Sequence, residues 1–191
     1  MRAMMGAEML TPPLPDDPVA ASIARGEHRA ALAACAHLHG ASIGRLCMAW
    51  LGSQAEADEA TQETLLAAYD AMRGFRGEST VRAWLYGIAR HVCARRQETR
   101  QRREARLRLV HTEADSAPGA ESLLAVRRRA ERVRAALEEL KPSERDALVL
   151  RFEAELSFRE VADACGIDEA AARKRVSRAL ERLRALLPDE L

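Results

Sequence analysis

The stretch LSFREVADACGIDEAAARKRVSRAL, residues 156–180, has the layout of two helices joined by a short turn. Ser157 and Glu160 form a capping box, in which each side chain bonds a free backbone N–H at the start of a helix. Gly166 permits the turn, and Asp168 can cap a second, longer helix. The pattern therefore predicts a helix-turn-helix, a motif whose second helix fits the major groove of DNA.

The second of these two helices is basic. Its expected outer face carries Arg173, Lys174, Ser177 and Arg178, with Arg175 and Arg182 flanking that face, and all six are candidate DNA contacts. Arginine in the major groove can form two hydrogen bonds to guanine or bind phosphates. A charged helix is often only the solvated face of a helical protein, but the capping box, the glycine turn and the basic helix together favour DNA binding.

Composition places the chain among helical proteins. Ala, Leu, Arg and Glu dominate, and aromatic residues make up only 4% of the 191 residues. The formal net charge of +1 gives no general attraction to nucleic acid, so any basic surface must be local. We therefore expect an all-α fold, and the length suits either one domain of common size or two small ones.

Apolar residues recur at helical spacing in both halves of the chain. Three amphipathic helices are expected over 27–51, 53–72 and 79–92, where Ser79 can cap the third, and together they would pack as a small bundle. Helical spacing resumes at Leu123, after a polar stretch that predicts a flexible linker. The expected organisation is a disordered tail at 1–25, a three- or four-helix domain at 26–98, a linker at 99–122 and a helix-turn-helix domain at 123–191.

The N-terminal stretch is rich in proline and has no basic patch followed by an apolar run. We expect a flexible tail there rather than a signal peptide. No run of about 18 apolar residues is present, so no membrane insertion is expected. The four cysteines lack CxxC spacing, which is typical of reduced thiols in a cytoplasmic protein.

Residues 75–91 mix cationic and aromatic side chains, the two kinds that single-stranded DNA binding requires. The candidates are Phe75, Arg76, Arg82, Tyr86 and Arg90. The glycine-containing loop before this helix can form a pocket for a flipped base. Trp84 lies on the apolar stripe and is expected in the core. By contrast, the helix expected over 53–72 is acidic, which indicates either a solvated face or a protein-docking surface.

Three segments resemble, in order, motifs of the sigma-70 family of RNA polymerase sigma factors. They are DEATQETL at 58–65, which resembles D-x-x-Q-E-T-F; FRGES at 75–79 with WLYGIAR at 84–90, which resemble F-R-G-E-S…W-L-Y-x-I-A-R; and LSFREVA at 156–162 with GI at 166–167 and RKRVSRA at 173–179, which are similar to L-S-Y-x-E-I-A…G-I…V-K-S-R-L-x-R-A. The resemblance covers about residues 27–187 and implies the extracytoplasmic-function (ECF) group.

The resemblance implies an alternative sigma factor, not an enzyme, that binds core RNA polymerase and directs promoter-specific initiation of transcription. The acidic helix is implied to dock on the clamp helices of the β′ subunit through Asp58, Glu59, Gln62 and Glu63. The loop and helix that follow are implied to melt the −10 element and trap a base, through Arg73, Phe75, Arg76, Ser79, Arg82, Tyr86, Arg90 and His91.

The same resemblance assigns roles to the rest of the chain. The linker is implied to thread toward the polymerase active centre, and the second domain to sit on the β flap and read the −35 duplex of promoter DNA with its basic helix. An anti-sigma factor held between the two domains is a further implied partner. No cofactor or metal is expected.

The sequence departs from the family pattern in four places. His91 stands where Asn is common, which affects the expected −10 base preference. The segment Ala170–Ala172 replaces a hydroxyl residue near the start of the recognition helix. Glu155 replaces a turn glycine, and Ala60–Thr61 replaces Leu-Val before the QET triplet.

Two other hypotheses compete with this interpretation. A stand-alone helix-turn-helix regulator would need only the second domain, and the motifs of the first domain argue against it. A metal or redox sensor could use Cys35, His37, His39 and Cys47, but on a helix His37 leaves the face shared by Cys35 and His39, and a structural zinc site wants four ligands. No phosphate-binding loop, metalloprotease motif or serine-hydrolase motif is present, which argues against an enzyme.

Overall fold

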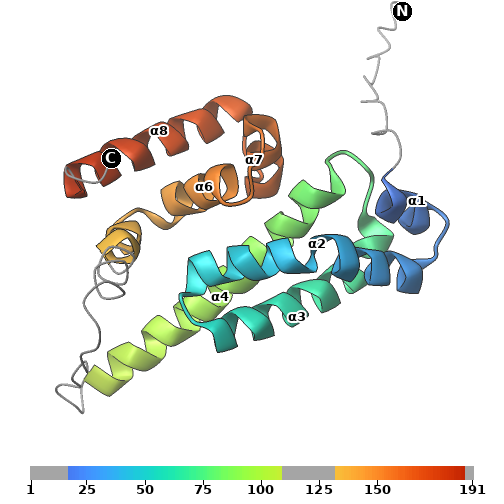
Figure 1. Ribbon diagram of the computed structural model, residues 1–191, viewed down its shortest axis with the longest axis horizontal. Coiled ribbons are helices and arrows are strands. Elements are labelled where there is room, and N and C mark those ends of the chain that lie inside the picture. The colour runs from blue at the N-terminus through green and yellow to red at the C-terminus, as the bar shows by residue number, and fades with distance from the viewer. Residues whose placement is uncertain (1–16, 109–131, 188–191) are drawn as a thin grey trace, which may run out of the picture.

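The helix-turn-helix predicted from residues 156–180 is present in the computed structural model, which describes residues 17–108 and 132–187 without the side chains of 104–108. The elements are α1 (Pro18–Ala24), α2 (His28–Leu51), α3 (Gln54–Ala71), the 3-10 turn η1 (Met72–Gly74), α4 (Val81–Arg108), a helical segment at 132–138, α6 (Pro142–Phe152), α7 (Phe158–Cys165) and α8 (Glu169–Leu186) (Figure 1). All regular structure in these ranges is helical, so the all-α prediction is confirmed. No helix in the described ranges combines the length and the hydropathy of a membrane span.

Helices α2, α3 and α4 form the first helical domain. The buried stripe of α2 includes Ile43, Leu46, Cys47 and Trp50, which have the helical spacing expected for residues 27–51. Helix α3 buries mostly alanine, so its backbone can lie close to α2. From α4, Leu85 and Val92 fill the remaining space between the three helices.

Helices α6, α7 and α8 form the second domain, and its turns follow the predicted caps. The Ser157 hydroxyl accepts a hydrogen bond from the Glu160 backbone N–H at 3.2 Å, while a Glu160 carboxylate oxygen accepts one from the Ser157 N–H at 2.9 Å. Gly166 has a φ of 64°, in the left-handed region that glycine favours. Asp168 caps α8 by accepting from the Ala171 N–H at 2.7 Å.

Two stretches differ from the expected tail and linker. Residues 18–24 form α1, because Asp17 caps it, Pro18 occupies its first turn, and Val19 and Ile23 bury one face. At the other end of the first domain, α4 continues through the first ten residues of the expected linker to Arg108. Residues 1–16 of the expected tail and 109–122 of the expected linker lie outside the described ranges.

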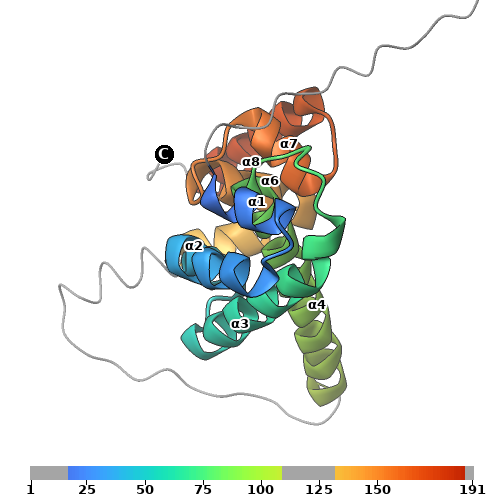
Figure 2. The same cartoon turned by 90° about the vertical axis from the view of Figure 1, so that its right-hand side faces the viewer.

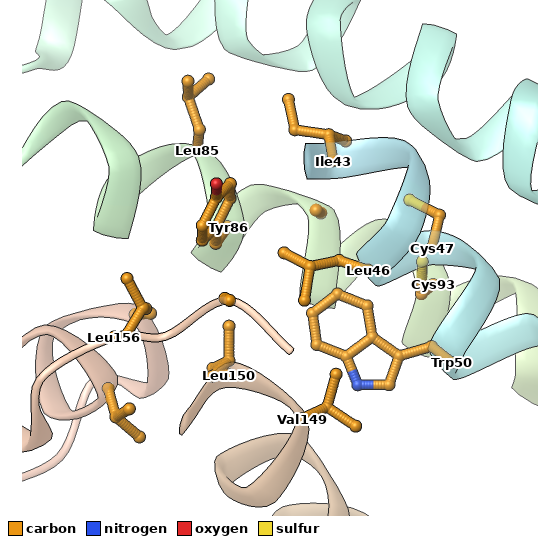
Figure 3. Packing of buried hydrophobic residues seen from close by; sticks show 14 of the residues in the cluster. Ile43, Leu46, Cys47, Trp50, Leu85, Tyr86, Cys93, Val149, Leu150 and Leu156 are labelled. Carbon is orange, nitrogen blue, oxygen red and sulfur yellow. The ribbon is translucent and has the colours of Figure 1, made fainter. Parts of the chain in front are cut away.

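The two domains pack against each other, with α4 against α7 and α2 against α6 (Figure 2). Figure 3 shows Leu46 and Trp50 of α2 facing Val149 and Leu150 of α6. At the α4–α7 contact, a Cβ on Gly87 would lie 3.1 Å from the Ala164 carbonyl oxygen. Glycine at this position therefore lets the two helix backbones approach closely.

Replacement of Leu46 by alanine is expected to lower the free energy of unfolding by about 2–5 kcal/mol, because it leaves a cavity where α2 meets the rest of the core. Urea denaturation followed by circular dichroism measures this change. The matched control is Leu66→Ala on α3, a leucine that is 64% exposed, for which the change should stay within about 0.5 kcal/mol. Equal losses in the two variants would contradict the core position of Leu46.

Candidate nucleic-acid interface

Helix α8 turns its basic residues outward. Its buried face consists of Ala172, Val176, Ala179 and Leu183, which pack on the other helices of the second domain. Of the six predicted contact residues, five are exposed and Arg175 is half-buried: Arg173, Lys174, Ser177, Arg178 and Arg182 form the exposed set. The structure therefore brings the five exposed residues of the predicted set together on the outer side of one helix, whereas Arg175 lies near Asp146 and Cys165.

Contacts within the domain orient two of these cations. The Arg173 guanidinium lies 4.4 Å from the centre of the Phe158 ring and also pairs with Glu169. Arg182 lies 3.8 Å from a carboxylate oxygen of Glu144, whose side chain is only 6% exposed. Within the described residues, Lys174 and Arg178 make no ion pair, so both charges are available to a ligand.

The loop before α4 holds the exposed part of the second candidate set. Arg73 and Arg76 are exposed, and the half-buried Phe75 ring packs on Trp84 with their centres 4.9 Å apart. Trp84 in turn packs against the core, as expected. The prediction that Ser79 caps the following helix is wrong: the Thr80 hydroxyl accepts from the Ala83 N–H at 3.0 Å, because α4 begins at Val81.

Three further residues of this set, Arg82, Tyr86 and Arg90, lie at the contact between the domains, whereas His91 is exposed and Ser79 is half-buried. Arg82 is 3.4 Å from a carboxylate oxygen of Glu160, which also accepts a hydrogen bond from the Thr80 hydroxyl at 3.1 Å. Arg90 is 3.4 Å from Asp146, and Tyr86 is 2% exposed. The structure thus covers Tyr86 and Arg90 with the second domain, and contact of either with DNA would require the domains to separate.

Burial and neighbouring charges shift the pKa values of groups along this contact. Burial raises the pKa of the Asp146 carboxyl, and the Arg90 guanidinium opposes that rise. Burial acts in the same sense on Glu160, but hydrogen bonds from Ser157 and the charge of Arg82 leave its pKa below the usual range. Burial, then Arg90 and Arg95, lowers the pKa of His91, which favours a neutral imidazole that can accept from Arg90 across the 3.0 Å separating their nitrogens.

The predicted protein-docking face on α3 is partly engaged within the chain. Glu63 pairs with Arg95 and Arg96 at 3.0 Å each, and Glu59 pairs with Arg96 at 2.9 Å. Asp58 accepts a hydrogen bond from Gln54 at 2.8 Å, and Gln62 is exposed. The two residues of the predicted set that remain outside these ion pairs are therefore Asp58 and Gln62.

The cysteines and histidines of α2 do not gather into a metal site. Cys35 is buried, and burial together with the Asp17 carboxylate raises its pKa to about 11, so the thiol stays protonated. His37 is exposed on another face of the helix. In residues 17–108 and 132–187, no three His, Cys, Asp or Glu side chains lie close enough to hold a metal ion.

Comparison with known proteins identifies the family. The family model "Sigma-70 region 2" matches residues 36–103, and "Sigma-70, region 4" matches residues 130–183. The ECF RNA polymerase sigma factor SigC of Mycobacterium tuberculosis is 35% identical over 150 residues, which cover 75% of this chain and 77% of SigC. The chain belongs to the sigma-70 family. The resemblance drawn from the sequence motifs to the ECF sigma factors is thus confirmed.

Other sigma factors extend this comparison. SigG of M. tuberculosis is 32% identical over 165 residues, which cover 74% of this chain but only 45% of SigG, so the chain spans less than half of that relative. Among solved structures, CnrH in complex with the cytosolic domain of CnrY gives a TM-score of 0.65 at 24% identity and covers 91% of this chain and 97% of CnrH. RpoE in complex with the anti-sigma factor NepR from Bartonella quintana gives 0.61 at 24% identity, covering 82% of this chain and 96% of RpoE. These two structures share the fold of the sigma factor described above.

Sequence reasoning missed the acidic residues that form ion pairs across the contact between the two domains. Glu160 was expected only as part of a capping box, and Asp146 was not singled out. Their partners Arg82 and Arg90 lie more than 50 positions away in the sequence. Local spacing carries no signal for pairs at that separation.

Neutralising both carboxylates, with Asp146→Asn and Glu160→Gln, is expected to separate the domains, since Arg82 and Arg90 lose their ionic partners. Glutamine can still serve in the capping box, so α7 should remain folded. Small-angle X-ray scattering should show a radius of gyration larger than that of the wild type. A compact chain of this length has a radius of gyration of about 16 Å. The control is Glu138→Gln with Glu139→Gln, two exposed carboxylates. Identical scattering from the three proteins would show that the ion pairs do not hold the domains closed.

Proposed function

We propose that the chain is an alternative sigma factor that binds core RNA polymerase and directs promoter-specific initiation. The observation that carries the proposal is the presence, in one chain, of two surfaces whose side chains suit DNA. One is the basic outer face of α8 in a helix-turn-helix, and the other is the arginine and aromatic surface of the loop before α4. Region 2, at residues 26–98, and region 4, at residues 123–191, would then act on the two separate elements of a promoter.

Helix α8 suits the duplex −35 element. Lys174 and Arg178 lie on its exposed face without ion-pair partners among the described residues, and Arg173 is held in place by Phe158. An arginine so presented can bind guanine with two hydrogen bonds or contact a phosphate. Ala170–Ala172 offers no hydroxyl at the start of this helix, so specificity falls mainly on the cations further along.

The loop and α4 suit the melted −10 element. Phe75 offers a ring for base stacking, and Arg73 and Arg76 offer charge to the phosphates. Ser79, Arg82, Tyr86, Arg90 and His91 complete the proposed −10 surface. Because region 4 covers part of that surface, we infer that the domains separate when the protein joins polymerase.

The proposed partners follow from the same assignment. Asp58 and Gln62, with Glu59 and Glu63 beside them, would dock on the clamp helices of β′, and region 4 would sit on the β flap. An anti-sigma factor is a further proposed partner, since the similar structures of CnrH and RpoE hold CnrY and the anti-sigma factor NepR. We also propose that the protein is located in the cytoplasm, where the polymerase works.

Run-off transcription with purified core polymerase tests the function. The template is a promoter library with randomised −35 and −10 elements, and the readout is which templates yield transcript when the protein is added. Specific transcripts that depend on both elements would support the proposal. Tight binding of the protein to duplex DNA without any initiation by core would instead indicate a stand-alone helix-turn-helix regulator.

Substitution of Arg178 by alanine is expected to weaken −35-dependent transcription, by about 1–3 kcal/mol of binding free energy if the side chain contacts a base. A base contact would relax the preference at one promoter position, whereas a phosphate contact would weaken binding to all sequences alike. Run-off yield across the same library distinguishes these results. Arg184→Ala, an exposed arginine in the last turn of α8, is the matched control, and equal yields from both variants would reject the assigned recognition face.

Substitution of Gln62 by arginine is expected to weaken association with core polymerase, because it places a cation on an exposed, otherwise acidic face of α3. Competition of the variant against labelled wild type for a limited amount of core should require about 10-fold more protein, which corresponds to about 1.4 kcal/mol. The same change at exposed Gln101 on α4 is the control. Unaltered competition by the Gln62 variant would remove α3 from the docking surface.

A further inference from the structure

A pocket of about 620 Å³ lies between α1 and the loop that precedes α4. Its volume is in the range of pockets that hold small organic groups. One wall comes from the loop and η1, and includes Met72, Arg73, Phe75, Arg76 and Gly77. The other wall comes from α1 and the start of α2, and includes Asp17, Ala20, Ala24 and His28. Figure 1 shows α1 beside the start of this loop.

Only one of the two walls, the loop wall, already has a role in the proposed function. The loop wall carries Arg73, Phe75 and Arg76, which belong to the proposed −10 surface. The α1 wall lies outside residues 36–103, the part matched by the region 2 family model. Any recognition by α1 would therefore be a feature that region 2 alone does not supply.

The side chains of the pocket suit an unpaired nucleobase. Phe75 is fixed by its contact with Trp84, and the His28 ring packs edge-on against Tyr69 with centres 6.4 Å apart. Aromatic rings held in this way can stack on a base, and the exposed Arg73 and Arg76 can neutralise the phosphates beside it. Stacking can hold a base drawn out of a DNA strand, and cations can bind the backbone beside it.

Asp17 does not fit the phosphate part of such a ligand, because a carboxylate repels a phosphate. One of its oxygens, Oδ1, accepts from the backbone N–H groups of Val19 at 2.9 Å and Ala20 at 3.3 Å, which fixes the side chain at the pocket wall. In the described part of the chain, no hydrogen bond reaches the second oxygen, Oδ2. A fixed carboxylate oxygen in a base pocket is an acceptor for the exocyclic amino group of a base.

We propose that this pocket receives one unpaired base of the −10 element and that Asp17 makes it select a base with an exocyclic amino group over thymine, which has none. This inference rests on the proposed sigma-factor function and adds α1 to the specificity-determining surface. The contact is a hydrogen bond from the amino group to Oδ2, and Phe75 stacks on the ring.

The test is Asp17→Asn, in which the residue keeps its capping role because asparagine is as good an N-cap as aspartate. Oδ1 can still accept from Val19 and Ala20, while an amide NH2 donor takes the place of the free acceptor Oδ2. The matched control is Asp70→Asn, an exposed carboxylate at the end of α3 that does not line the pocket. Circular dichroism of both variants checks that their folds are intact.

The full-length protein, joined to core polymerase, transcribes a library in which every position of the −10 element is randomised, and sequencing of the transcripts gives the base preference at each position. We expect the wild type and the Asp70 variant to disfavour thymine at one position by about 5-fold, the low end of the range for a bidentate base contact, because the proposed contact is a single hydrogen bond. The Asp17 variant should lose or reverse the preference at that position only.

Two other results would overturn the inference, and they differ from each other. An Asp17 variant with the wild-type base preference, whatever its total yield, would reject the role of Asp17 while the sigma-factor function stands. A wild-type protein that yields no transcript from any template would reject the proposed function and the pocket assignment with it.

Discussion

Glu160 contributes both to the start of a helix and to the contact between the two domains, through its hydrogen bonds and its ion pair. The carboxylate closes the capping box that starts α7, and it also accepts from Thr80 and pairs with Arg82 at the start of α4. Its side chain is only 17% exposed, so salt screens these contacts less than those of a surface pair. Local folding of the helix-turn-helix and contact between the domains therefore depend on the same side chain.

Helix α4 connects the other surfaces of the protein. Its N-terminal turn follows the loop that bears Phe75, and its middle packs on α7, where Gly87 permits close approach. Its C-terminal half carries Arg96, which neutralises acidic residues of α3. Because one rigid helix carries these three contacts, separation of the domains would uncover its middle without disturbing its packing on α3.

The sequence predicted the parts of the fold that local rules control. The capping box at Ser157, the turn at Gly166 and the buried stripe of α2 all depend on residues a few positions apart. Glu155 replaces a turn glycine of the family, and the structure shows why glycine suits that position, since the φ of Glu155 is 53°. The helix α1 was missed because the prolines before it suggested a tail, although Asp17 followed by Pro18 is also a helix start signal.

The contacts that cross the domain boundary could not be predicted in this way. Together with ion pairs inside the domains, they show where many charges of the protein are neutralised. A net charge of +1 hides 30 basic and 29 acidic residues. Many of them neutralise one another across helices, as Arg96 does with Glu59 and Glu63, and as Arg90 does with Asp146. The proposed recognition face of α8 keeps Lys174 and Arg178 outside any ion pair among residues 17–108 and 132–187. A surface with so few available cations would neutralise few phosphates and bind duplex DNA weakly by itself, which is consistent with a protein that reads promoters only as part of a larger assembly.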